Sequence, residues 1–287
     1  MKITNLLNLP APIVRAVTND PYNKGDCDYS TTGLIKPARI AALEKLHASE
    51  ITEDASDRIW SLCGQIGHLI LERAGGDDIA EKRYFADYKG YRISGQVDII
   101  TKPDGKHHLQ DYKFTSVFAA KDGLKPEWEA QLNINRWICQ QNGIEIEAAS
   151  IVAIFRDWSK GKARRESDFP QKQVQILNAP LWTKEKVEQY LHERICAHVA
   201  AFTVLPECTD AERWAKASTW AIKKRGGARS IPRGVHTTLA DAEAHLRSLD
   251  SGYEIETRKG TSVRCLDYCP CVQFCVFGKQ QLEEAAK

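Results

Sequence analysis

The sequence predicts an α/β fold in which helices flank a mixed central sheet, with a small α/β unit and a cysteine cluster at the C-terminal end. Apolar residues recur at helical spacing in three long segments, 56–73, 127–142 and 184–203. Between them the pattern is that of strands, over 84–116, 148–155 and 172–177. We therefore expect a core in residues 1–207 and the small unit in residues 208–287.

The remaining elements follow from local signals. Helical structure is predicted after a loop, over 28–73, where Ser30, Thr31 and Thr32 offer caps. The small unit is expected to contain a helix opening at Thr209, strands near 218–222 and 228–236, a helix over 239–249 and a strand over 253–257.

Length and composition limit which classes of protein this chain can belong to. The 287 residues, 43% of them hydrophobic, are enough to bury a full core. The N-terminal segment is interrupted by Pro10 and Pro12, and no run approaches the roughly 18 apolar residues of a membrane span. We therefore expect a cytoplasmic protein with no membrane partner. The net charge of +2 does not by itself indicate a nucleic-acid partner, because the net charge of the whole chain does not show whether basic residues are clustered.

A hairpin in the strand region carries the strongest chemical signal. With Asp104 and Gly105 as its two-residue turn, Asp98 lies opposite Asp111 and Gln96 opposite Lys113, all on one face. Two facing carboxylates repel each other, and a divalent cation such as Mg²⁺ or Mn²⁺ removes that repulsion. The ammonium of Lys113 is then placed to orient water and offset phosphate charge. The alternative is a surface hairpin with ordinary solvated charges.

The helix over 56–73 offers a further candidate ligand. Gly64, His68 and Glu72 form one stripe of this helix at i, i+4 spacing. Its expected core face consists of Ile59, Leu62, Ile66 and Ile70. A single helix histidine is by itself more often structural or exposed than a metal ligand.

These segments together resemble the RecB-like branch of the PD-(D/E)XK nuclease superfamily. SGQVDII, DYK and EAQLNINRW are similar to its D, (D/E)XK and Q motifs, and GQIGHLILE is similar to its histidine motif. The resemblance implies a restriction-endonuclease-like core, with metal ligands Asp98, Asp111 and His68, catalytic Lys113 and a helix glutamine, Gln131. Branch members often have tyrosine four residues after that glutamine, where this chain has Asn135. Glu81 matches an acidic position of the branch, or it is a solvated charge at the strand entry.

Cysteine usage points to a second metal centre. Four of the nine cysteines lie within eleven residues, at Cys265, Cys269, Cys271 and Cys275. In a reducing compartment such clusters more often hold metal than form disulfides, and thiolates accept either Zn²⁺ or an iron–sulfur cluster. Cys208 is the expected distant partner. Cys63, Cys139 and Cys196 fall within helices and are expected to be small core residues.

The resemblance extends to this cluster. Some RecB-like nucleases, among them AddB-type and CRISPR-associated proteins, bind a [4Fe–4S] cluster through one distant and three C-terminal cysteines. Cys208, Cys265, Cys269 and Cys275 look similar to that arrangement. Cys27 is a rival for Cys208, Cys271 is a rival for any of the other three, and Zn²⁺ is the alternative occupant.

Phosphate binding requires local basic groups, and three clusters qualify. They are Lys36 with Arg39; Lys160, Lys162, Arg164 and Arg165 in an expected loop; and Lys223, Lys224, Arg225, Arg229 and Arg233 beside Trp220. Each is also compatible with an ordinary solvated surface. No helix-turn-helix or zinc-finger pattern is present, so we expect contacts to the DNA backbone rather than to base edges.

The sequence therefore predicts a Mg²⁺- or Mn²⁺-dependent deoxyribonuclease, and specifically an exonuclease of recombination or DNA-end processing similar to small phage-type members. DNA and a recombination or single-strand-annealing protein are the expected partners. The alternatives are an inactive nucleic-acid-binding or scaffold protein of nuclease fold, and an endonuclease that is structure-specific or of restriction type.

Overall fold

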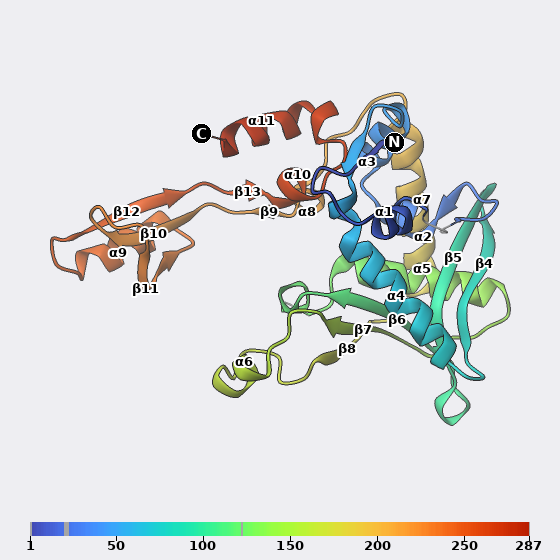
Figure 1. Ribbon diagram of the computed structural model, residues 1–287. Helices are drawn as coiled ribbons and strands as arrows, with labels where there is room; N and C mark the ends of the chain where they lie inside the picture. Colours follow the sequence, from blue (N-terminus) through green and yellow to red (C-terminus); the bar gives the residue numbers. More distant parts are fainter. Residues whose placement is uncertain (1, 20–22, 122, 287) are drawn as a thin grey trace. The chain divides into compact units, whose positions relative to one another are not determined.

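The computed structural model describes residues 2–19, 23–121 and 123–286, and these form two compact units of a mixed α/β protein (Figure 1). The first unit comprises 1–42 and 52–205, and the second comprises 43–51 and 206–287. Residues 43–51, expected in the core, thus group with the C-terminal unit. Within the described residues, no helix has the length and apolar character that crossing a membrane requires.

A six-stranded mixed sheet forms the centre of the first unit, as the sequence predicts. Its strands are β2 (Tyr29–Ser30), β4 (Ile79–Tyr88), β5 (Tyr91–Thr101), β6 (His108–Thr115), β7 (Ala148–Phe155) and β8 (Val174–Asn178). The order is β2-β5-β6-β7-β8, and β4 pairs with β5. The β2–β5 and β6–β7 pairs are parallel and the others are antiparallel. A separate parallel pair joins β1 (Lys2–Thr4) to β3 (Thr52–Asp54).

Helices cover both faces of this sheet (Figure 1). The helices of residues 11–200 are α1 (Ala11–Thr18), α2 (Thr31–Ile35), α3 (Ala38–Leu46), α4 (Ile59–Ala74), α5 (Pro126–Gln141), α6 (Lys160–Arg165) and α7 (Lys184–Ala200). Of these, α2, α4 and α5 make the main contacts with strands of the sheet. Along β6, Lys113 contacts α5 through Gln131, whereas Phe114 lies beside Gly67 of α4. Because neighbouring side chains of a strand point to opposite faces, α4 and α5 lie on opposite sides of β6.

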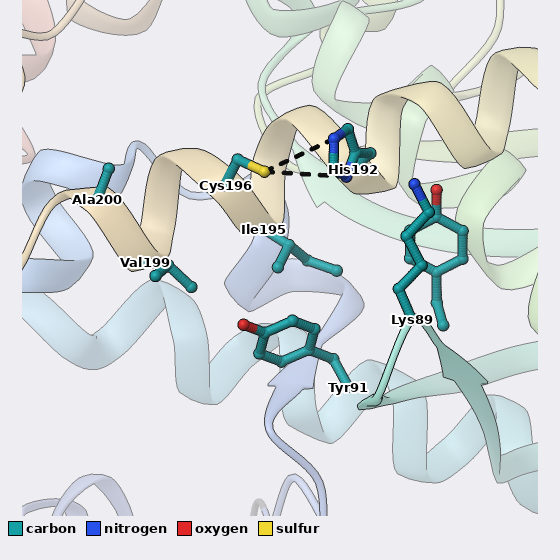
Figure 2. Close-up of a pocket in the computed structure, with 8 residues that line it drawn as sticks. Lys89, Tyr91, His192, Ile195, Cys196, Val199 and Ala200 are labelled. Atoms are coloured by element: carbon teal, nitrogen blue, oxygen red, sulfur yellow. Dashed lines mark hydrogen bonds between the residues drawn. The ribbon is translucent and has the colours of Figure 1, made fainter.

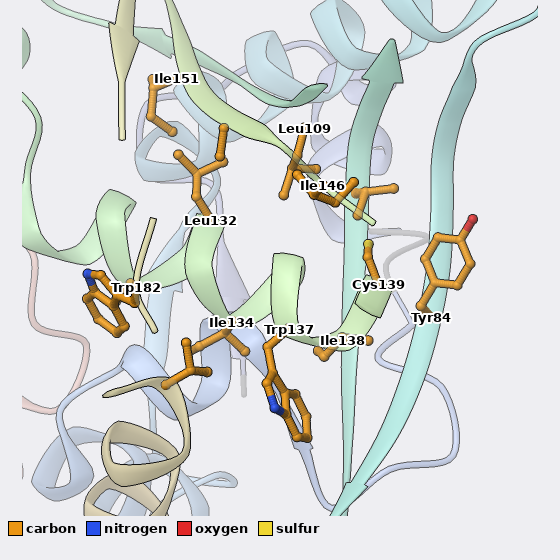
Figure 3. Packing of buried hydrophobic residues seen from close by; sticks show 14 of the residues in the cluster. Tyr84, Leu109, Leu132, Ile134, Trp137, Ile138, Cys139, Ile146, Ile151 and Trp182 are labelled. Carbon is orange, nitrogen blue, oxygen red and sulfur yellow. The ribbon is translucent and has the colours of Figure 1, made fainter. Parts of the chain in front are cut away.

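The core lies between α5 and the sheet (Figure 3). Leu132 and Ile138 of α5 are almost fully buried, against Leu109 of β6 and Ile151 of β7. Asn135 is also buried: it accepts a hydrogen bond from the Thr31 hydroxyl (2.7 Å) and donates one to the Gln96 carbonyl (3.1 Å). Asn135, four residues after Gln131, therefore joins α5 to α2 and β5.

The second unit contains a three-stranded antiparallel sheet of order β11-β10-β12. Its strands are β10 (Thr219–Lys224), β11 (Ser230–His236) and β12 (Tyr253–Arg258), and α9 (Leu239–Arg247) packs on all three. Its other elements are α8 (Asp210–Arg213), β9 (Ala215–Lys216), β13 (Thr261–Ser262), α10 (Val263–Asp267) and α11 (Val276–Ala285). The strands and helices expected for residues 209–257 are present, with ends shifted by a few residues.

Some elements differ in type from the expectation: β2 and β3 are short strands within residues 28–73, where helical structure was predicted. The basic segment Lys160–Arg165 is the short helix α6 rather than a loop. Ser159 precedes it in an extended conformation, and the Ser159 hydroxyl accepts a hydrogen bond from the Lys162 N–H (3.3 Å). This N-cap, which satisfies a backbone donor of the first turn, is the physical reason for the difference.

Candidate metal centre

The predicted hairpin forms with the predicted register. Ile99 pairs with Gln110, Ile100 with Leu109, and Thr101 with His108. At the tip, Asp104 and Gly105 have positive φ angles of 51° and 79°, and the Lys106 N–H donates to the Pro103 carbonyl (3.0 Å). Positive φ at both central residues is what a tight type I′ turn requires.

The backbone ladder between β5 and β6 stops one residue before the two aspartates. In place of a backbone pair at this level, the Tyr112 N–H donates to Oδ2 of Asp98 (2.7 Å). The expected backbone pairing of Asp98 with Asp111 is therefore replaced by a contact from side chain to backbone. Backbone pairing between β5 and β6 thus ends where the candidate residues begin.

Helix α4 lies close to β6 because Gly67 has no side chain. A Cβ atom on Gly67 would lie 2.0 Å from Cζ of Phe114 on β6. The neighbouring residue, His68, places its Nδ1 atom 2.9 Å from Oε1 of Glu81 and 3.6 Å from Oδ2 of Asp98. His68 thus lies beside Asp98 and Glu81, where its motif predicted it. The lack of a side chain at Gly67 allows α4 to approach the sheet this closely.

The expected core face of α4 is wrong in its second half, whereas Ile59 and Leu62 are half-buried. Ile66 and Ile70 are 49% and 58% exposed, and Glu72, on the predicted His68 stripe, is exposed as well. Because Gly67 packs on Phe114, the face that carries Gly67 and His68 meets the sheet. Ile66 and Ile70 therefore face outward.

Glu81 lies within β4 with an unusual backbone. Its neighbours pair as Ala80 with Ile99 and Lys82 with Val97, so Glu81 lies level with Asp98. Its φ is +47°, which side-chain-bearing residues rarely adopt. The Glu81 carboxylate accepts hydrogen bonds from His68 and from Nε2 of Gln96 (2.6 Å). Strain of this kind persists where the surrounding contacts fix it, and it concentrates at functional sites.

Glu81→Gly and Glu81→Ala test this strain. Both remove the carboxylate, but glycine adopts positive φ freely and alanine does not, so Glu81→Gly should be the more stable by about 1 kcal/mol. In an ordinary strand glycine is the less stable of the two. Urea unfolding of the metal-free variants measures the difference. Greater stability of the alanine variant would contradict the left-handed conformation.

A second group of side chains surrounds Asp111, which is buried. Its Oδ1 atom accepts a hydrogen bond from Nε2 of Gln131 (2.6 Å), and its Oδ2 atom lies 2.5 Å from Nζ of Lys113. Lys113 also donates to Oε1 of Gln131 (3.1 Å). The structure thus brings Asp111, Lys113 and Gln131 into one closed network.

Electrostatics at the site indicate crowded negative charge. Burial, followed by the neighbouring Asp111 carboxylate, raises the pKa of Asp98 to about 7. Burial alone would lower the pKa of Lys113, but the Asp111 and Asp98 carboxylates outweigh it and raise that pKa. The hydrogen bond to Glu81 raises the pKa of His68. Added positive charge at this point would stabilise the ionised carboxylates.

The donor atoms fit a divalent cation. One nitrogen of His68 and one carboxylate oxygen each of Glu81 and Asp98 all lie within 4.8 Å of one another. Oδ2 of Asp111 is buried, and apart from its close ion pair with Lys113 it makes no hydrogen bond within the described residues. Carboxylates with one imidazole suit Mn²⁺ and Mg²⁺. The sequence did not predict the hydrogen bonds that support Glu81. Arg83 donates to Oε1 of Gln96 (2.5 Å), and Nε2 of Gln96 donates to the Glu81 carboxylate.

The C-terminal cysteines lie in the second unit with Cys208. Cys271 and Cys275 are buried, and burial followed by the nearby Cys275 raises the pKa of the Cys265 thiol. Burial also raises the pKa of Cys269, whose sulfur accepts a hydrogen bond from the Cys271 backbone N–H. Within the described residues, no three cysteine sulfurs lie within 4.8 Å of one another.

The other cysteines have different surroundings. Cys27 is in the first unit, where its thiol donates to the Lys24 carbonyl and lies 3.3 Å from the Ser94 hydroxyl. Cys139 is buried as expected, but Cys63 and Cys196 are exposed, so their assignment to the core is wrong. Helical spacing alone does not tell which face of a helix is covered.

Cys196 lies at a pocket of about 300 Å³ between α7 and the turn from β4 to β5 (Figure 2). The side chains of Tyr91, Ile195 and Val199 supply apolar walls, and the Cys196 sulfur lies 3.8 Å from the ring nitrogens of His192. None of the predicted site residues lines this pocket.

The predicted DNA-contact residues fall in three places. Lys36 and Arg39 are half-buried next to α2 and in α3, and the Lys36 carbonyl accepts a hydrogen bond from Arg194. Arg164 and Arg165 are exposed on α6. Lys223 on β10 forms ion pairs with Glu256 (3.0 Å) and Glu254 (3.6 Å), whereas Lys224 and Arg225 are exposed.

Comparison with known proteins identifies no relative by sequence. No protein-family model and no curated protein matches the chain. Among solved structures, that of SSO0001 is similar with a TM-score of 0.44 and 19% sequence identity. The similarity covers 64% of this chain and 82% of that chain, and at this TM-score it does not establish a shared fold.

Proposed function

We propose that this chain is a Mg²⁺- or Mn²⁺-dependent DNA nuclease of the PD-(D/E)XK type, with RecB-like motifs, that trims DNA from a free end. One observation carries the proposal. Ligand atoms of His68, Glu81 and Asp98 lie within 4.8 Å of one another where the β5–β6 pairing ends, and the network of Asp111, Lys113 and Gln131 includes the other aspartate of the same hairpin. An ordinary solvated hairpin has no reason to gather these groups.

Each side chain has a role in this proposal. His68, Glu81, Asp98 and Asp111 would hold the cation, which when bound supplies a more acidic water and offsets charge on the phosphate. Lys113, held by Asp111 and Gln131, stabilises negative charge on the phosphate oxygens as water attacks. A bond forms between the water oxygen and phosphorus, the bond to the 3′-oxygen breaks, and a proton passes to that oxygen. The products are a 5′-phosphate and a 3′-hydroxyl.

The same proposal assigns a [4Fe–4S] cluster to the second unit, with Cys265, Cys269 and Cys275 as ligands and Cys208 as the fourth. Two observations support it: burial, together with nearby cysteine thiols, raises the pKa of Cys265 and Cys269, and a backbone N–H donates to the Cys269 sulfur. Each thiolate of such a cluster binds a different iron, so the sulfurs lie farther apart than around a single Zn²⁺ ion.

Digestion of end-labelled DNA tests the proposed activity. With Mn²⁺ or Mg²⁺ at low salt, linear duplex should be degraded, while covalently closed duplex of the same sequence should remain, because it offers no end to thread. Chelator should stop the reaction. Equal cleavage of both forms would replace the exonuclease with an endonuclease, and absence of cleavage in every metal would leave a binding or scaffold protein.

A further inference from the structure

The hairpin between β10 and β11 is a concentrated positive surface. From Lys223 to Arg233 the chain has five basic residues and no acidic residue. The turn is tight: Gly226 has a φ of +70°, and the Gly227 N–H donates to the Lys224 carbonyl (2.8 Å). The five basic residues thus lie along one hairpin, whose strand β10 is the central strand of the sheet β11-β10-β12 (Figure 1).

Most of this charge is not neutralised by the protein. Lys223 is paired with Glu256 and Glu254 of β12. The other four basic residues are exposed and form no ion pair with any described residue: Lys224, Arg225, Arg229 and Arg233. Four uncompensated cations on one hairpin fit an anionic partner.

Two features of the hairpin favour duplex DNA over other partners. β11 is an edge strand, but Pro232 lacks an N–H and Arg233 has a φ of +57°. A peptide strand added at this edge could therefore not form a continuous ladder of backbone hydrogen bonds. No aromatic residue lies between Lys223 and Arg233, whereas single-strand binding depends on base stacking.

We propose that the β10–β11 hairpin binds the sugar–phosphate backbone of duplex DNA, through Arg225 and Arg229 at its tip together with Lys224 and Arg233. The assignment rests on the proposed nuclease function. It adds a contact with the duplex that is distinct from the candidate metal centre. Contacts of this kind hold the substrate without selecting its sequence.

Fluorescence anisotropy with a labelled duplex tests the hairpin, using the full chain in EDTA to prevent hydrolysis. The double variant Arg225→Gln, Arg229→Gln should bind at least about tenfold more weakly at low salt. Its salt slope should also be shallower, by about 0.9 for each phosphate contact removed. The matched control, Lys259→Gln with Lys279→Gln, removes two exposed charges of the same unit and should bind like the wild type.

Several outcomes overturn the assignment. Unchanged affinity and salt slope in the arginine variant would refute it, as would a loss confined to single-stranded DNA or an equal loss in the lysine control. Arg225→Lys with Arg229→Lys should retain binding, which separates charge from folding. Failure of the proposed function looks different: the wild type would bind duplex through the hairpin yet cleave nothing in Mn²⁺.

Discussion

Asp98→Asn is expected to lower metal-dependent DNA cleavage at least about 10²–10³-fold while making the metal-free protein more stable. Asparagine can still accept the Tyr112 N–H, so the local backbone contact survives. What disappears is one buried negative charge beside Asp111. A residue whose replacement removes activity and raises stability is serving the site rather than the fold.

The stability gain should depend on pH in a defined direction. Because the folded protein raises the pKa of Asp98 to about 7 from an ordinary value near 4, the native state binds the proton more tightly than the unfolded state. Wild-type stability therefore falls as pH rises from about 4 to 7. The advantage of Asp98→Asn should grow over this interval and then level off. Urea unfolding in chelator at pH 5 and pH 8 measures it.

Asp104→Asn is the matched control for this charge removal. Asp104 is exposed at the tip of the same hairpin, and its positive φ suits asparagine. Its cleavage rate and stability should equal those of the wild type. Asp111→Ala and Lys113→Ala should also abolish cleavage. Wild-type rates in Asp98→Asn would remove this site from the proposal, and lost stability would make Asp98 a structural residue.

Cys269→Ser is expected to eliminate the iron that we propose for the second unit. Protein purified without oxygen should be brown and contain about four iron atoms per chain, and the serine variant should be colourless. Because binding of the cluster stabilises the folded unit, the variant should also unfold at lower urea concentration. Iron analysis and visible absorption provide measurements that do not depend on nuclease activity.

Other cysteines provide the controls for the iron experiment. Cys63→Ser, at an exposed position of α4, should keep full iron content. Cys208→Ser and Cys27→Ser decide between the two candidates for the distant ligand, and Cys271→Ser tests the rival of the three C-terminal ligands, because only a ligand's loss should cost iron. Stoichiometric zinc without iron would assign a Cys₄ zinc site instead, and a stable protein containing neither metal would refute both.

The hairpin was predictable because its register is fixed locally. Asp104 and Gly105 favour one turn, the turn sets which residues pair, and the ladder from Ile99 to Thr101 follows. The convergence of Lys113 with Gln131 was available only from the motif resemblance. Periodicity cannot show that a helix glutamine and a strand lysine meet.

Other parts of the site depend on tertiary contacts that leave no periodic signal. The face of α4 that meets the sheet is decided by Gly67, a residue that contributes nothing to a hydrophobic pattern. Likewise the positive φ of Glu81 is imposed by its partners, since glutamate has no intrinsic preference for it. A glycine beside the histidine was the one available sign of close helix packing.

The short ladder between β5 and β6 gives the first unit a seam. Within the described residues, three backbone pairs join β4 and β5 to the strands that begin with β6. Glu81 and Asp98 belong to one side of this seam and Asp111 to the other. A cation bound by residues from both sides would link them. The free energy of cation binding would then oppose the separation of β5 from β6. Resistance of the whole first unit to proteolysis would then increase with the occupancy of the metal site.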